Sequence, residues 1–128
     1  MCLFVKGKIQ VAKEPITVYK IITVENKSKY QHFRYTPDTL YRLRKALKTK
    51  RLYGDRVIEP GFHAYRTLGY TKRALSYTKR ALTGYIVRSW SREKIVEFTI
   101  PKGAKYYLGH NNDIVSTSIR SGSLVPIK

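Results

Sequence analysis

The charge balance of this chain constrains its fold and its partners more than any other feature. The 128 residues include 26 Lys and Arg but 8 Asp and Glu, which gives a formal net charge of +18 at pH 7. A globule of this length has a radius of roughly 14 Å, and charges interact over about 8 Å at physiological salt. The excess therefore opposes compaction, and a polyanionic partner that relieves the repulsion is the simplest explanation for it.

The cations gather in two segments that contain no acid. Between Asp38 and Asp55 every charged side chain is basic, and the same holds between Glu59 and Glu93. An ordinary solvated helix alternates acids and bases, which support each other four residues apart. Because nothing nearby in the sequence neutralises these cations, we expect both segments to contact a polyanion. The predicted contact residues are Arg42, Arg44, Lys45, Lys48, Lys50, Arg51, Arg66, Lys72, Arg73, Lys79, Arg80, Arg88 and Arg92.

The apolar fraction of 42% suffices for one hydrophobic core, so residues 1–128 are predicted to form a single domain. β-branched and aromatic residues dominate Ile16–Val24, which makes it the clearest strand of the N-terminal half. In Ile95–Ile100 the alternation predicts a strand with Val96, Phe98 and Ile100 on one face. Arg92–Lys94 is expected to be the turn before it. Further extended segments are expected at Leu3–Val11, Tyr30–Tyr35, Arg56–Glu59, Tyr85–Trp90, Ala104–Leu108 and Ile114–Ile119.

Two helices are predicted between these groups of strands. Thr36-Pro37-Asp38 has the residues of a helix start, Leu40, Leu43 and Leu47 follow at helical spacing, and Gly54 supplies a stop. Residues 70–76 recur as 77–83 (Tyr-Thr-Lys-Arg-Ala-Leu followed by Ser or Thr), and a seven-residue repeat aligns equivalent side chains along a helix. The expected fold class is therefore α+β: a small, mostly antiparallel sheet with two basic helices between N-terminal and C-terminal strands.

Nucleic acid, with RNA favoured, fits the composition best among polyanions. The chain has 11 Tyr, several of them interleaved with the basic residues, and exposed rings can stack on unpaired bases. Core packing is the alternative for these rings, and we prefer it for Tyr70 and Tyr77. With one Cys a zinc finger is excluded. The predicted stacking or pocket residues are Tyr41, Tyr53, His63 and Tyr65.

The sequence offers little support for catalysis. It has no phosphate-binding loop, no paired metal-ligand spacing and no glycine-flanked nucleophilic serine. Ser116-Thr117-Ser118 resembles the strand motif of one class of ADP-ribosyltransferases, but the Glu-x-Glu which that class needs downstream is missing, since no acid follows Asp113. We therefore expect a protein that is not an enzyme and uses no cofactor or metal. An ADP-ribosyltransferase-like nucleotide-binding enzyme or pseudoenzyme, with His63 and Tyr65 in a pocket, is the alternative.

The expected location is the cytoplasm of a bacterial host. Cys2 cannot form an internal disulfide, no apolar run approaches the length of a membrane span, and the first residues lack the pattern of a signal peptide. No membrane partner is expected, and the sequence does not determine the oligomeric state.

Three islands of sequence carry a resemblance to known proteins. Val18-Tyr19-Lys20, Gly61-Phe62-His63-Ala64-Tyr65, and Ile100–Tyr107 leading to Asp113–Ser116 resemble small proteins of unknown function from Bacteroidota and their phages. The resemblance implies a phage or mobile-element origin. Together with the acid-free basic segments it suggests a host-defence inhibitor of the anti-CRISPR type that docks on RNA or on a ribonucleoprotein nuclease. The alternative is a phage structural protein associated with the genome.

Overall fold

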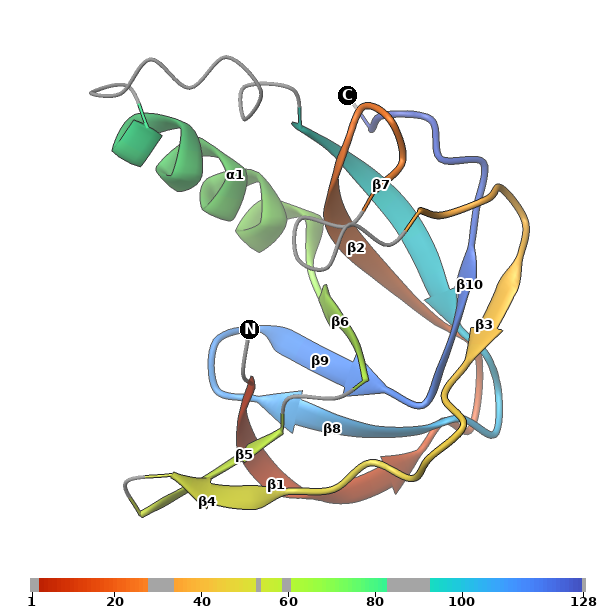
Figure 1. Cartoon of the computed structure of the whole chain (residues 1–128), viewed down its shortest axis with the longest axis vertical. Helices are drawn as coiled ribbons and strands as arrows, with labels where there is room; N and C mark the ends of the chain where they lie inside the picture. The colour runs from red at the N-terminus through yellow and green to blue at the C-terminus, as the bar shows by residue number, and fades with distance from the viewer. Residues whose placement is uncertain (1–2, 28–33, 53, 59–60, 83–92, 128) are drawn as a thin grey trace.

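The computed structural model describes residues 3–27, 34–52, 54–58, 61–82 and 93–127 (Figure 1). Ten strands of this described part form one sheet, in the order β3-β10-β7-β2-β6-β9-β8-β1-β5-β4, and all neighbours are antiparallel. One helix, α1 (Leu68–Leu82), accompanies them. The strands are β1 (Leu3–Val11), β2 (Ile16–Thr23), β3 (Leu40–Arg42), β4 (Lys50–Leu52), β5 (Asp55–Ile58), β6 (Phe62–Tyr65), β7 (Glu93–Ile100), β8 (Lys105–Gly109), β9 (Asp113–Ser116) and β10 (Ser118–Ser121).

The longest ladder joins β2 to β7. It runs without interruption from Ile16 opposite Ile100 to Thr23 opposite Glu93. Val96, Phe98 and Ile100 are fully buried, which confirms the predicted inward face of this strand. The strand begins earlier than expected, because Glu93 and Lys94 pair with β2 instead of forming a turn.

The sheet bends strongly around its core. In Figure 1 the strands β7, β2 and β10 run steeply, whereas β8, β9 and β1 cross the lower part of the view at a large angle to them. One buried cluster accordingly combines Phe98 of β7, Val18 of β2 and Ile119 of β10 with Ile114 of β9. A single curved sheet can therefore enclose its own core, with little help from a helix.

The helix α1 confirms the element predicted from the seven-residue repeat. Thr67 precedes it, and the Thr67 hydroxyl oxygen accepts the backbone N–H of Tyr70 at 3.3 Å, as an N-cap residue does. The side-chain oxygen of Asn112 in turn accepts the N–H of Thr67 at 3.0 Å. The start of α1 is thus tied to the turn between β8 and β9.

The predicted α+β fold class with two helices is wrong: the protein is a mostly antiparallel β structure, and residues 36–52 are not helical. Asp38 has φ of 51°, in the left-handed region, which a right-handed helix cannot continue through. Residues 40–42 instead pair with β10, where Tyr41 lies opposite Ile119. The leucine spacing correctly indicated that Leu43 and Leu47 pack against the core. Residues 40–42 are nevertheless extended, because they pair with strand β10, which lies far away in the sequence.

Several smaller predictions can also be compared with the structure. The strand at Leu3–Val11 is confirmed, and residues 101–103 form a turn closed by a hydrogen bond from the N–H of Ala104 to the carbonyl of Pro101. Segment Ile114–Ile119 is split between β9 and β10 at Thr117. Tyr85–Trp90 and most of Tyr30–Tyr35 lie outside the described residues. In the described part, the helix is neither long nor apolar enough to cross a membrane.

Candidate nucleic-acid interface

The first basic segment forms an exposed arm at the rim of the sheet. We call residues 42–51 the basic arm. It starts at the end of β3, crosses a stretch without regular structure and enters β4, the last strand of the sheet order. All six of its cationic side chains are exposed: Arg42, Arg44, Lys45, Lys48, Lys50 and Arg51.

Two leucines fasten the basic arm to the body of the protein. The side chain of Leu47 is 7% exposed and belongs to a buried cluster with Leu3, Val5, Ile58 and Val115, against which Leu43 also packs. The backbone N–H of Leu43 donates to the carbonyl of Thr117 at 2.8 Å. Because these contacts use the apolar positions, the intervening cations are held pointing into solvent.

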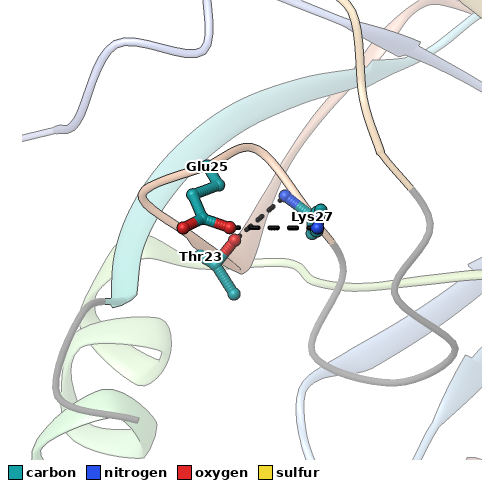
Figure 2. Close-up of polar contacts among 3 residues, drawn as sticks. All are labelled: Thr23, Glu25 and Lys27. Atoms are coloured by element: carbon teal, nitrogen blue, oxygen red, sulfur yellow. Dashed lines mark hydrogen bonds and ion pairs between the residues drawn. The ribbon is translucent and has the colours of Figure 1, made fainter. Parts of the chain in front are cut away.

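Five cations of the basic arm have no acidic partner in the described part of the chain. Among the described residues, no carboxylate lies within ion-pair distance of Arg42, Arg44, Lys45, Lys48 or Arg51. Figure 2 shows the contrasting case of Lys27, whose Nζ lies 3.9 Å from Oε2 of Glu25 while its N–H donates to the hydroxyl of Thr23. These five side chains therefore keep their positive charge for an external ligand.

The cationic surface continues from the basic arm onto β5. Arg51 of β4 lies directly opposite Arg56 of β5, and both are exposed. Like charges directly opposite each other destabilise a strand pair. An anion bound between the two guanidinium groups would relieve this repulsion.

The second basic segment lies elsewhere on the molecule. Arg66, Lys72 and Arg73 are exposed at the start of α1, and the Arg73 guanidinium lies over the Tyr70 ring at 5.8 Å from its centroid. In Figure 1, α1 lies at the upper left, whereas the basic arm runs from β3 at the right to β4 at the bottom. The described cations of the second segment therefore lie apart from the basic arm. The side chains of Lys79 and Arg80, and all of Arg88 and Arg92, lie outside the described residues.

The aromatic residues predicted to stack on bases mostly support the fold. Tyr41 meets Tyr35 edge to face at 5.5 Å between centroids, and its hydroxyl accepts the N–H of Thr36 at 2.7 Å. Tyr65 packs on Tyr70 at 5.4 Å. His63 lies half-buried on β6, in register with Val115 of β9. Tyr53 lies outside the described residues.

A pocket that the sequence did not reveal adjoins Arg56. It has a volume of about 330 Å³ and is lined by Phe4 and Val5 of β1, Asp55 and Arg56 of β5, and His110 and Asn111 of the β8–β9 turn. The Phe4 side chain is 44% exposed. The alternation of Leu3, Phe4 and Val5 could have indicated an outward Phe4, but no local pattern could bring the three segments together.

The buried environment of Lys20 was also not predicted from the sequence. It sits on β2 between the inward-facing Val18 and Ile22, and its Nζ donates to the carbonyl oxygen of His63 at 2.5 Å. The ammonium also lies 5.6 Å from the Tyr35 ring centroid and 5.9 Å from that of Phe98. Burial lowers the pKa of Lys20 to about 8. A lysine within an alternating apolar strand was the available signal.

The serine motif that suggested ADP-ribosyl transfer has an internal role. Ser116 is fully buried, and its hydroxyl donates to the carbonyl of Ser118 at 2.8 Å. This bond spans the junction of β9 and β10, so the side chain stabilises the bend between them.

The described residues offer no metal site, and the chain matches no known protein. Among the described residues, no group of three or more His, Cys, Asp and Glu side chains is arranged to hold a metal ion. No protein-family model, curated protein or solved structure matches this chain.

Proposed function

We propose that this protein binds nucleic acid, with single-stranded RNA favoured, through the basic arm. The observation that carries the proposal is the anchored arm itself, which exposes Arg42, Arg44, Lys45, Lys48 and Arg51 with no carboxylate of the described residues within ion-pair distance. When a protein binds nucleic acid without sequence specificity, contacts from Lys and Arg to the phosphates supply most of the affinity.

Single strands are favoured over duplex DNA by the shape of this surface. Proteins that read duplex DNA commonly place a helix in the major groove, whereas the basic arm is a strand, a coil and a second strand at a sheet rim. Proteins that bind single strands combine a cationic track with exposed aromatic rings. Here Phe4 lies beside Arg56, at the end of the track.

Charge reversal in the basic arm tests the proposal. The triple variant Arg44→Glu, Lys45→Glu, Lys48→Glu should bind labelled oligouridine at least about tenfold more weakly. The slope of log affinity against log salt should fall by about 2, because each lost phosphate contact with a single strand removes about 0.7. Fluorescence anisotropy over a salt series measures both quantities.

A matched variant separates position from total charge. Lys13 and Lys102 are exposed on two turns joined by the hydrogen bond from the N–H of Gly103 to the carbonyl of Ala12, and the exposed Lys105 begins β8 nearby. Changing these three to Glu lowers the net charge from +18 to +12, as the arm variant does. Its salt slope should stay close to that of the wild type. Equal losses in the two variants would show that net charge, and not the arm, determines binding.

The proposed inhibition of a host ribonucleoprotein nuclease needs a separate experiment. The protein is used as bait in bacterial lysate at moderate salt, with and without nuclease treatment. Retention of one ribonucleoprotein after nuclease treatment, lost with the arm variant, would support that specific role. Recovery of mixed nucleic acid that is released by a small increase in salt would contradict the inhibitor role. It would leave general nucleic-acid binding as the function.

A further inference from the structure

We infer that the pocket beside Phe4 holds one unstacked base of the bound strand and prefers guanine. This inference rests on the proposed function, since the basic arm supplies the strand. The volume of about 330 Å³ lies at the lower end of the range of small-ligand sites.

Backbone hydrogen bonds fix the walls of the pocket. The N–H of His110 donates to the carbonyl of Phe4 at 3.2 Å, which ties the β8–β9 turn to β1. The N–H of Asn111 donates to Oδ1 of Asp113 at 3.2 Å, so the turn is also braced from within. These bonds place the imidazole and the amide at one rim of the pocket before any ligand arrives.

The position of Arg56 is fixed by a bulge in β1. Gly7 has φ of 82°, and the β1–β8 register shifts between Lys6 and Gln10. The Nη2 atom of Arg56 donates to the Gly7 carbonyl at 2.7 Å. The remaining donors of the guanidinium can bind a phosphate at the mouth of the pocket, next to Arg51 of the basic arm.

Phe4 supplies the surface on which a base can stack. It is the aromatic residue among the large hydrophobic side chains that the described structure leaves exposed. Stacking on an aromatic ring is available to every base, because every base has a π-face. Phe4 therefore explains affinity for an unpaired base but not a choice among bases.

The polar lining supplies that choice. The carboxylate of Asp55 accepts hydrogen bonds and donates none at neutral pH. Guanine presents two adjacent donors, N1–H and the N2 amino group, which match the two oxygens of a carboxylate. Adenine and uracil each present one donor next to an acceptor on the same edge. With these bases one carboxylate oxygen would face an acceptor, and the two cannot form a hydrogen bond. Asp55 thus favours guanine over these bases.

Oligonucleotides that differ in one base test the inference. We expect an oligouridine with one central guanosine to bind about tenfold more tightly than plain oligouridine, as a bidentate base contact provides. A central adenosine should increase the logarithm of the affinity by less than half as much as a central guanosine does. Asp55→Asn should abolish the guanosine preference, and Phe4→Ala should weaken binding of both purine-containing oligonucleotides.

Controls separate this inference from the proposed function. Ile9→Ala removes another exposed hydrophobic residue of β1 that does not line the pocket, and it should keep the guanosine preference. Thermal unfolding checks that each variant is folded. Equal binding of all oligonucleotides, sensitive to the arm variant alone, would overturn the guanine pocket and leave the proposed function standing. Failure to bind any of them would overturn both.

Free guanosine monophosphate distinguishes a strand from a free nucleotide. Because the nucleotide lacks the phosphates that reach the basic arm, it should displace the guanosine-containing oligonucleotide only at concentrations at least about a hundredfold higher. Displacement at equal concentration would overturn the inference that the pocket serves a bound strand.

Discussion

Raising the pH from about 8 to about 10.5 should increase the free energy of unfolding by about 3 kcal/mol through Lys20 alone. The ammonium of Lys20 is enclosed by the carbonyl of His63 and the rings of Tyr35 and Phe98. Loss of hydration on burial lowers the pKa of Lys20 to about 8 from the ordinary 10.5. Between these two values the unfolded chain binds a proton that the folded protein has released, and stability therefore rises with pH.

Tyr35 limits this rise on the alkaline side. Burial, helped by the neighbouring Tyr41, raises the pKa of Tyr35 from 10.0 to about 12. A raised pKa contributes stability that is complete below pH 10 and is lost as the pH rises toward 12. The combined effect of Lys20 and Tyr35 is a maximum of stability near pH 10.

Urea unfolding at several pH values measures this effect. Lys20→Met should remove most of the rise between pH 8 and 10, whereas Lys13→Met, which changes an exposed lysine, should keep it. The slope is a better readout than stability at pH 7, because Met also leaves the His63 carbonyl without its donor. If the Lys20 and Lys13 variants keep the same slope, the rise comes from loss of general charge repulsion and Lys20 has no special role.

The sequence predicted those elements whose stability is decided locally. β2 and β7 carry dense β-branched residues, and the alternation around Phe98 identified the buried face before any partner was known. The repeated Tyr-Thr-Lys-Arg-Ala-Leu unit likewise predicted α1. In each case the period of the pattern matches the geometry of the element itself.

The errors arose where distant segments decide the outcome. Leu43 and Leu47 have helical spacing, yet β10 supplies hydrogen bonds to residues 40–42, and the cluster around Val115 accepts both leucines from a stretch without regular structure. The pocket beside Phe4 combines residues from positions 4, 55 and 110. No local sequence pattern predicts that these three segments lie together. The position of Arg51 opposite Arg56 likewise depends on the pairing of β4 with β5. The charge of the basic arm could be predicted, whereas its shape could not.

Gly61 connects the packing of the basic arm to the core of the sheet. Its φ is 126°, in the region that favours glycine, and a Cβ there would lie 2.9 Å from Cδ2 of Leu47 and closer still to Cγ2 of Val115. We expect Gly61→Ala to lower the free energy of unfolding by about 4 kcal/mol, since backbone strain and overpacking each cost about 1–3 kcal/mol. Gly54 is the matched control: its φ is 86°, but a Cβ there meets nothing within 4 Å. Gly54→Ala should cost about 1–2 kcal/mol.

A double-mutant cycle tests whether Leu47 is the group that Gly61 accommodates. Leu47→Ala alone should cost about 2–5 kcal/mol, because the side chain is 7% exposed within the cluster that anchors the arm. In the Gly61→Ala background the same change frees space for the new Cβ, so the double variant should be at least about 1 kcal/mol more stable than the two single losses predict. Urea unfolding of the four proteins gives the coupling energy. A coupling near zero would mean that the new Cβ at position 61 does not meet Leu47 and that Val115 alone resists it.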